Sequence, residues 1–227
     1  MKKIVAITLT LLTFAYAQKV PVINNYLSTD IKTKSWLELR NKNVEIQKYD
    51  TSCGAAALAT ILKYFYYKDV SELDIINFFL RKKGLLPKKI KELRKEDFEF
   101  SFKDLKEFAE QKGFNAVGLA LPVESLKALK FPGIIYIKYK NYQHFTVFKG
   151  MDDKFVYLAD PMFGNIVMKI NRFKKLFYIG KNKKQGKILV IYPKNVKNLN
   201  QIFIQKGKNN LKIIYETIII KSVNFNQ

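Results

Sequence analysis

The stretch Gln47-Lys-Tyr-Asp-Thr-Ser-Cys53-Gly-Ala-Ala-Ala-Leu58 contains the only cysteine of the chain and leads into an apolar run of helix-forming residues. The polar residues from Asp50 to Ser52 are typical of a helix cap, so we expect a helix that begins at Cys53 and ends near Tyr67. The backbone N–H groups of a first helical turn are unpaired and favour an anion. This position therefore favours the thiolate, the nucleophilic form of a cysteine.

A base for this thiol would have to be His144, because the chain contains no other histidine. Apolar runs predict a strand over His144–Lys149 and a second strand over Phe155–Ala159. The turn-forming segment between them, Gly150–Lys154, indicates an antiparallel hairpin. Asp160 ends the second strand, so we expect its carboxylate beside the imidazole, where it would hold the ring in the tautomer that can accept a proton from the thiol.

Other polar side chains are candidates for a role at the same site. Gln47 lies six residues before Cys53, and we expect its side-chain NH2 to donate to an oxyanion beside the Cys53 backbone N–H. Asp152 and Asp153 are alternative partners for His144, but they fit the hairpin turn better. The predicted set is a nucleophile, a general base and acid, an orienting carboxylate and an oxyanion donor: Cys53, His144, Asp160 and Gln47.

Helical patterns dominate the first half of the chain and strand patterns the second. Two more helices are expected in the first half, over Leu73–Leu80 and from Ser101 to Gly113, where Ser101-Phe-Lys-Asp104 resembles a capping box. Short helices are expected over Val123–Lys130 and Arg172–Phe177 in the second half. The other expected strands are Asn115–Leu119, Gly133–Tyr139, Ile166–Ile170 and Lys187–Tyr192. Helices followed by an antiparallel sheet indicate an α+β fold, with the nucleophile helix packed on the C-terminal sheet.

The N-terminus has the pattern of a targeting segment. Residues 1–17 combine a basic start, a short apolar core and the small residues Ala15 and Ala17. This predicts a signal peptide cut after Ala17, and hence a periplasmic or secreted protein. The apolar run is too short for a membrane span, and no later segment of the sequence is long and apolar enough for one.

The sequence divides into a domain over residues 45–193 with an extension at each end. Residues 18–44 are expected to form an extended lead-in. Residues 194–227 form a β-rich extension that includes a predicted hairpin over 201–220. This hairpin would be either an added edge of the sheet or a docking strand for a partner or substrate.

The formal net charge of +22 raises the question of a nucleic-acid partner. The basic residues are mostly lysines spread along the chain and no nucleic-acid motif is present, so we expect no such partner. One cysteine and one histidine cannot build a zinc shell without clustered carboxylates, and there is no glycine-rich phosphate loop. We therefore expect no metal or cofactor. A lone cysteine also excludes an internal disulfide, and a buried structural thiol is the alternative to a reactive one.

At these residues the sequence resembles the C39 peptidases, the papain-like cysteine proteases best known as leader-peptide-cleaving domains of bacteriocin exporters. The matching pieces are Gln47 to Ala56, His144 to Val147, Asp160-Pro161 with Gly164, and a closing segment with Phe173, Gly180 and Ile188 to Ile191. The resemblance covers roughly residues 45 to 192. It implies a papain-like fold, a thioester acyl-enzyme on Cys53 and a protein or peptide substrate.

The chain differs from the transporter-fused members of that family, because its sequence shows no membrane or ATPase domain and begins with a predicted signal peptide. It is similar to stand-alone exported members, including those found with bacterial functional-amyloid secretion systems. Secretion or amyloid-assembly machinery is therefore a candidate partner, and cleavage after a Gly-Gly-type pair is implied by the family alone. A thiol-dependent amidase or acyl transferase, and a catalytically silent peptide-binding module on the same fold, are the alternatives.

Overall fold

The computed structural model describes residues 19–24, 27–32, 34–85, 94–139, 142–178 and 184–194. The chain divides into two compact units between Leu39 and Arg40. The predicted signal peptide and the predicted hairpin near the C-terminus lie outside the described residues.

The first unit contains an antiparallel hairpin. Strand β1 (Lys19–Asn24) pairs with β2 (Leu27–Lys32) in a continuous register. The short helix α2 (Trp36–Arg40) follows, and its start is fixed by reciprocal hydrogen bonds between Ser35 and Glu38. The segment that we expected to be merely extended therefore contains regular structure, because it has enough β-branched residues for a strand pair.

The second unit begins with its helices. They are α3 (Cys53–Thr60), the π-helix η2 (Ile61–Phe65), α4 (Glu72–Lys82), the short 3-10 helix η4 (Lys95–Phe98) and α5 (Phe102–Gln111). Capping boxes begin α4 at Ser71 and α5 at Ser101, as the second of these sequences predicts. After α5 the chain turns at Gly113, whose φ of 91° favours glycine.

The helix at Cys53 begins where the sequence predicts, but it does not continue as an α-helix to Tyr67. After Thr60 the helix changes from the α to the π type, in which a hydrogen bond spans five residues. The backbone N–H of Tyr66, for example, donates to Ile61 O. The hydroxyl of Thr60 donates to Ala56 O, a local contact that bends helices. The same hydroxyl accepts from the backbone N–H of Glu45. This tertiary contact lies outside the periodicity from which the helix was predicted.

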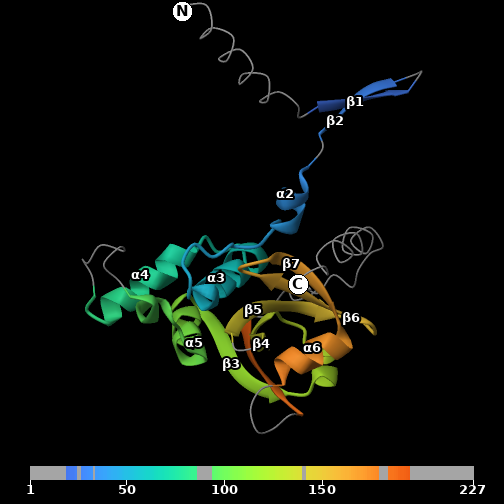
Figure 1. Ribbon diagram of the computed structural model, residues 1–227. Coiled ribbons are helices and arrows are strands. Elements are labelled where there is room, and N and C mark those ends of the chain that lie inside the picture. Colours follow the sequence, from blue (N-terminus) through green and yellow to red (C-terminus); the bar gives the residue numbers. More distant parts are fainter. Residues whose placement is uncertain are drawn as a thin grey trace, which may run out of the picture. The chain divides into compact units, whose positions relative to one another are not determined.

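The sheet has six antiparallel strands in the order β3-β8-β4-β5-β6-β7. They are β3 (Phe114–Leu121), β4 (Gly133–Tyr139), β5 (Tyr142–Met151), β6 (Phe155–Asp160), β7 (Gly164–Lys169) and β8 (Gly186–Pro193). The 3-10 helix η5 (Val123–Ala128) precedes β4, and α6 (Ile170–Phe177) follows β7. Helices α3, α4 and α5 gather on one side of the sheet and α6 on the other (Figure 1). The predicted α+β fold is thus confirmed.

Each face of the sheet has its own apolar core. The helices α3, α4 and α5 pack on a cluster that includes Ile134, Val147 and Leu189 from the strands. The opposite face packs against α6 and η5, through Phe173 and Phe177 of α6 among others. Since the central strands are covered on both sides, their side chains are fixed in position.

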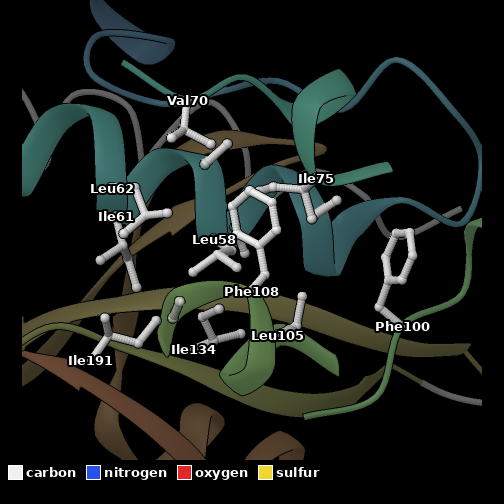
Figure 2. Close-up of a cluster of buried hydrophobic side chains, with 14 of the residues drawn as sticks. Leu58, Ile61, Leu62, Val70, Ile75, Phe100, Leu105, Phe108, Ile134 and Ile191 are labelled. Atoms are coloured by element: carbon white, nitrogen blue, oxygen red, sulfur yellow. The ribbon is translucent and has the colours of Figure 1, made fainter. Parts of the chain in front are cut away.

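Helix α3 is the centre of the first core, because every residue from Cys53 to Thr60 is buried. Leu58 is fully buried and points from α3 toward Phe108 of α5 and Ile134 of β4 (Figure 2). Glycine at position 54 allows a close approach, since a Cβ there would lie 3.2 Å from a ring carbon of Phe145. The start of α3 is therefore held directly against β5.

We expect Leu58→Ala to lower the free energy of unfolding by about 2–5 kcal/mol, because it removes buried methyl groups and leaves a cavity beneath α3. Urea unfolding followed by circular dichroism measures this loss. The matched control is Leu73→Ala on α4, since Leu73 is 39% exposed and should cost far less. Equal losses in the two variants would contradict the central position of α3 in the core.

Strand β5 contains a β-bulge near its middle. Phe148 pairs with Leu158, but the next pair is Gly150 with Tyr157, so one residue of β5 has no partner on β6. Gly150 has a φ of 147°, a conformation that other residues seldom adopt. The bulge separates the half of β5 that begins near His144 from the half that leads into the hairpin turn.

Candidate active site

Cys53 lies at the first position of α3 and its side chain is 6% exposed. The backbone N–H of Phe145 lies 3.5 Å from Sγ, which places the thiol beside β5. The helix start has no side-chain cap, contrary to our expectation for the preceding polar residues. Ser52 occupies the cap position, but its hydroxyl contacts Tyr49 O and Glu72 instead.

Asp50, the other predicted capping residue, points elsewhere as well. Its carboxylate lies 2.9 Å from Lys95 Nζ, and both side chains are largely exposed. An exposed ion pair of this kind contributes little to stability. The backbone N–H groups of the first turn of α3 are thus left without a side-chain acceptor from Ser52, which keeps the helix N-terminus open to the thiol.

His144 and Asp160 form a buried pair at one end of the sheet. His144 Nε2 lies 2.9 Å from Asp160 Oδ2, and the two side chains are 1% and 0% exposed. Val147 pairs with Ala159, so Asp160 lies diagonal to His144 on neighbouring strands, close enough for side-chain contact. The other ring nitrogen, Nδ1, is buried and has no hydrogen-bond partner among the described residues.

The surroundings of His144 favour its protonated form. Burial lowers the pKa of the imidazole, but the hydrogen bond with Asp160 and the charges of Asp160 and Cys53 outweigh this and raise it to about 9. The thiol lies beside the strand that contains the ring, because Sγ is 3.5 Å from the backbone nitrogen of Phe145, the residue after His144. The structure thus brings the predicted nucleophile, base and orienting carboxylate together.

Asp160 is oriented by its own turn. Its second oxygen, Oδ1, accepts hydrogen bonds from the backbone N–H groups of Met162 at 2.9 Å and Phe163 at 3.1 Å. This arrangement is common for an aspartate that initiates a turn. With Oδ1 bonded to the backbone, Oδ2 is directed at His144, so the ring and the carboxylate keep one relative orientation.

The turn after Asp160 packs against the segment that precedes Gln47 and is hydrogen-bonded to it. Gly164 has a φ of 76°, and a Cβ there would lie 2.7 Å from Arg40 O, so only glycine fits. Asn165 donates through Nδ2 to Arg40 O at 2.9 Å and to Lys42 O at 2.8 Å. These contacts hold the two loops at the site together.

Gln47 is part of this same junction. Its backbone N–H donates to Pro161 O at 2.9 Å, and its side-chain Nε2 donates to Tyr49 O at 3.0 Å and Asp50 O at 3.2 Å. An amide NH2 has two hydrogens, and both have acceptors here. Donation to an oxyanion would therefore require exchange of one of these bonds, and the predicted oxyanion role of Gln47 stays a prediction.

The alternative partners for the imidazole lie in the hairpin turn. Asp152 accepts hydrogen bonds from the backbone N–H groups of Lys154 and Phe155, both at 2.7 Å. Asp153 forms an exposed ion pair with Lys127. Since the carboxylate at hydrogen-bond distance from His144 belongs to Asp160, these two aspartates act as turn residues.

An open cleft of about 480 Å³ adjoins this site. Its lining includes Gln47, Asp50, Tyr142 and Met162. The ring of Tyr142 lies 5.8 Å from that of His144, while Met162 lies in the turn that begins at Asp160. Tyr142 and Met162 are exposed, and a partly apolar lining of this kind suits an extended peptide. Neither residue has a sequence pattern that indicates this position, although each lies two residues from a predicted catalytic side chain.

Neither a metal site nor a membrane-spanning helix is found in the part of the chain that the structure describes. Within residues 34–85, 94–139, 142–178 and 184–194, no three His, Cys, Asp or Glu side chains gather as a metal site would require. None of the described helices has both the length and the apolar character needed to cross a membrane.

Comparison with known proteins gives consistent matches. Residues 85–195 match the model of the peptidase C39 family, a range that includes His144 and Asp160 but not Cys53. The probable functional amyloid protease FapD of Pseudomonas fluorescens is 37% identical over 134 residues, which cover 59% of this chain and 56% of the relative. FapD of Pseudomonas aeruginosa is 33% identical over 144 residues, which cover 63% and 61%. The chain thus matches about three fifths of the length of these relatives.

A solved structure supports the same fold. The crystal structure of a double glycine motif protease from an AMS/PCAT transporter, in complex with the leader peptide, is similar with a TM-score of 0.51 and 28% sequence identity. The match covers 66% of this chain and 90% of that one. The α+β architecture described above is therefore the one found in that protease domain.

Proposed function

Because residues 85–195 match the model of the peptidase C39 family, we propose that the chain hydrolyses a peptide bond through an acyl-enzyme on Cys53. The observation that carries the proposal is the buried pair of His144 and Asp160 beside the only thiol of the chain. A thiolate next to an imidazolium is the resting state of papain-like catalysis.

The reaction follows from the positions of these groups. Cys53 Sγ attacks the carbonyl carbon of the substrate, a C–S bond forms, and the carbonyl electron pair moves to the oxygen. His144 then gives its proton to the leaving amine as the C–N bond breaks, which leaves a thioester. Water attacks this thioester, His144 takes the proton of the water, and the thiolate leaves as the C–S bond breaks. Asp160 keeps the ring aligned and stabilises its positive charge in both steps.

The substrate that we propose is a protein or peptide cut after a Gly-Gly-type pair. The support is the likeness to a protease described as a double glycine motif protease in complex with a leader peptide. The cleft beside Gln47 and Tyr142 offers an exposed, partly apolar surface next to the catalytic residues. Because glycine has no side chain, a Gly-Gly pair lets the peptide backbone approach a nucleophile closely.

We propose further that the protein acts in the periplasm or outside the cell, on a substrate of secretion or amyloid-assembly machinery. The predicted signal peptide over residues 1–17 supports export. The relatives described as probable functional amyloid proteases support the second part. Detection of the mature chain with Gln18 as its first residue in a periplasmic or culture fraction tests the export.

We expect the purified chain to cut a peptide that contains Gly-Gly at least about tenfold faster than the same peptide with Ala-Ala. Mass spectrometry of the products measures the cut, and a free carboxylate on the new C-terminus identifies hydrolysis. A new amide on that carbonyl would instead indicate an acyl transferase. Equal rates for the two peptides would contradict the glycine preference and leave the peptidase activity standing.

A catalytically silent binding module is separated from an enzyme by the reactivity of the thiol. Cys53 beside a protonated His144 should react with iodoacetamide at mildly acidic pH, where an ordinary thiol, with a pKa of about 8.5, reacts slowly. Slow labelling at pH 5 to 6, together with no cut in either peptide, would contradict the proposed function.

A further inference from the structure

A buried carboxyl outside the predicted catalytic set contacts the loop that contains Gln47. Glu72, the first residue of α4, is 1% exposed, and buried glutamates need partners. The backbone N–H of Lys48 lies 3.1 Å from each of its carboxyl oxygens, and the hydroxyl of Ser52 contacts Oε1. Glu72 thus joins the residue after Gln47 to the residue before Cys53.

Ser52 extends this contact to the side chain of Gln47. Its Oγ lies 2.8 Å from Tyr49 O, and the same carbonyl oxygen accepts a hydrogen bond from Gln47 Nε2 at 3.0 Å. Glu72 does not line the cleft, yet it is linked to the predicted oxyanion donor through Ser52 and Tyr49 O.

The number of hydrogens that Tyr49 O, Ser52 and Glu72 can share indicates that the Glu72 carboxyl is neutral. The hydroxyl of Ser52 has one hydrogen but lies at hydrogen-bond distance from two oxygens. When it donates to Tyr49 O, the hydrogen between Ser52 and Glu72 must come from the carboxyl. Oε1–H then donates to Ser52, and Oε2 accepts from the backbone N–H of Lys48.

The charges near Glu72 are compatible with this state. Burial raises the pKa of the carboxyl above its ordinary value, and the nearby Glu45 raises it as well. The contacts with the Ser52 side chain and the Lys48 backbone, and the charge of Lys48, lower it without cancelling the rise. The capping box of Ser71 and Asp74 fixes the start of α4 and so the position of Glu72.

We propose that Glu72 is a positioning residue that acts as a neutral carboxylic acid and holds the Gln47–Ser52 loop in the arrangement that the reaction requires. This inference rests on the proposed function, because it concerns the predicted oxyanion donor of that reaction. Glu72 touches no reacting atom, and it acts through Ser52 and the backbone of the loop.

The first test separates oxyanion stabilisation from the reactivity of the thiol. Glu72→Ala should lower kcat for the Gly-Gly peptide about 10- to 100-fold with little change in KM, because a misplaced donor acts in the transition state. The rate of Cys53 alkylation by iodoacetamide should stay within about twofold, since alkylation forms no oxyanion. Glu107→Ala, at an exposed glutamate paired with Lys82, is the matched control and should change neither rate.

A conservative variant provides the rescue. In Glu72→Gln the amide NH2 can donate to Ser52 and the amide oxygen can accept from Lys48, as the neutral acid does. We expect its kcat to lie within about threefold of the wild-type value. A glutamine variant as slow as the alanine variant would overturn the neutral acid.

The pH dependence of stability gives a second readout of that proton. The pKa of Glu72 is raised on folding, so its contribution to stability is complete below its unfolded value of about 4.5 and is lost as the pH rises through the folded value. Glutamine has no such titration. The Tm of Glu72→Gln relative to wild type should therefore rise from pH 4 to pH 8, and a fall over this range would overturn the neutral acid.

Two results for Glu72→Ala would overturn the proposal. A Glu72→Ala variant with wild-type kcat, or one that loses cleavage and alkylation equally, overturns the positioning role. If the wild-type chain cuts no peptide, the proposed function fails. The side-chain amide signal of Gln47 in a ¹⁵N-labelled sample then decides the inference, since it must shift in Glu72→Ala and return in Glu72→Gln.

Discussion

Cys53→Ala is expected to abolish cleavage of the Gly-Gly peptide, with a fall in kcat of at least about 10⁴-fold, because no other thiol is present to form the acyl-enzyme. The variant is expected to fold like the wild-type chain. Among the described residues Sγ accepts a hydrogen bond from Phe145 N, and the loss of this one contact should leave the core around α3 intact. Mass spectrometry of the peptide products measures the rate, and a thermal melt verifies folding.

Cys53→Ser is the matched control for size. A serine hydroxyl occupies nearly the same space but is a much weaker nucleophile beside a histidine, so this variant should fold like wild type and remain nearly inactive. Cleavage at the wild-type rate in the alanine variant would remove Cys53 from the mechanism. A large fall in Tm in both variants would point to a structural thiol instead.

Asp160→Asn is expected to lower kcat by about 10²- to 10⁴-fold while the fold is kept. The asparagine oxygen can still accept from Met162 N and Phe163 N, so the turn should persist. Its NH2 would face His144 Nε2 and force the proton onto the other ring nitrogen, which is the tautomer that cannot accept from the thiol. Steady-state kinetics on the Gly-Gly peptide measures the loss.

The pH dependence of this variant should change in a defined direction. In wild type the pKa of His144 is raised to about 9, so the stability gained from the protonated ring is present below about pH 6.5 and is lost as the pH rises through about 9. Without the carboxylate, burial lowers the pKa and Cys53 alone opposes it, so this loss of stability between pH 6.5 and 9 should become smaller. Denaturant unfolding across this range measures the change.

Asp153→Asn is the control, because it removes a carboxylate from the same hairpin without touching His144. We expect no more than a twofold change in kcat for this variant. A silent Asp160→Asn variant would move the orienting role to Asp152 or Asp153, against the 2.9 Å contact in the structure.

The sequence predicted the fold class because each half of the chain has its own period. The capping box at Ser101 and the alternation in the strands are local signals, and the structure places helices and strands there. The contact between His144 and Asp160 was also predictable, since a hairpin brings the two ends of its strands together. His144 and Cys53 each stood out through being the only residue of their kind.

What the sequence could not supply are the contacts between segments far apart in the chain. Ser52 reads as a helix cap because serine is common there, yet its hydroxyl turns to a glutamate twenty residues later. Glu72 reads as an acidic residue in the first turn of a helix, where such residues favour the dipole. Neither pattern reveals that the two side chains meet in a buried position. The occupied amide of Gln47 was missed for the same reason, because its acceptors are defined by a loop shape and not by spacing.

The bulge in β5 determines where this chain could gain or lose a residue without disturbing the site. Because side chains alternate along a strand, adding or deleting one residue between His144 and Phe148 would turn the imidazole away from Asp160. Beyond the unpaired residue before Gly150, the ladder already accommodates a shift of one, so loop growth in the hairpin turn need not reach the site. One strand thus contains a segment of fixed length next to a segment that is free to vary.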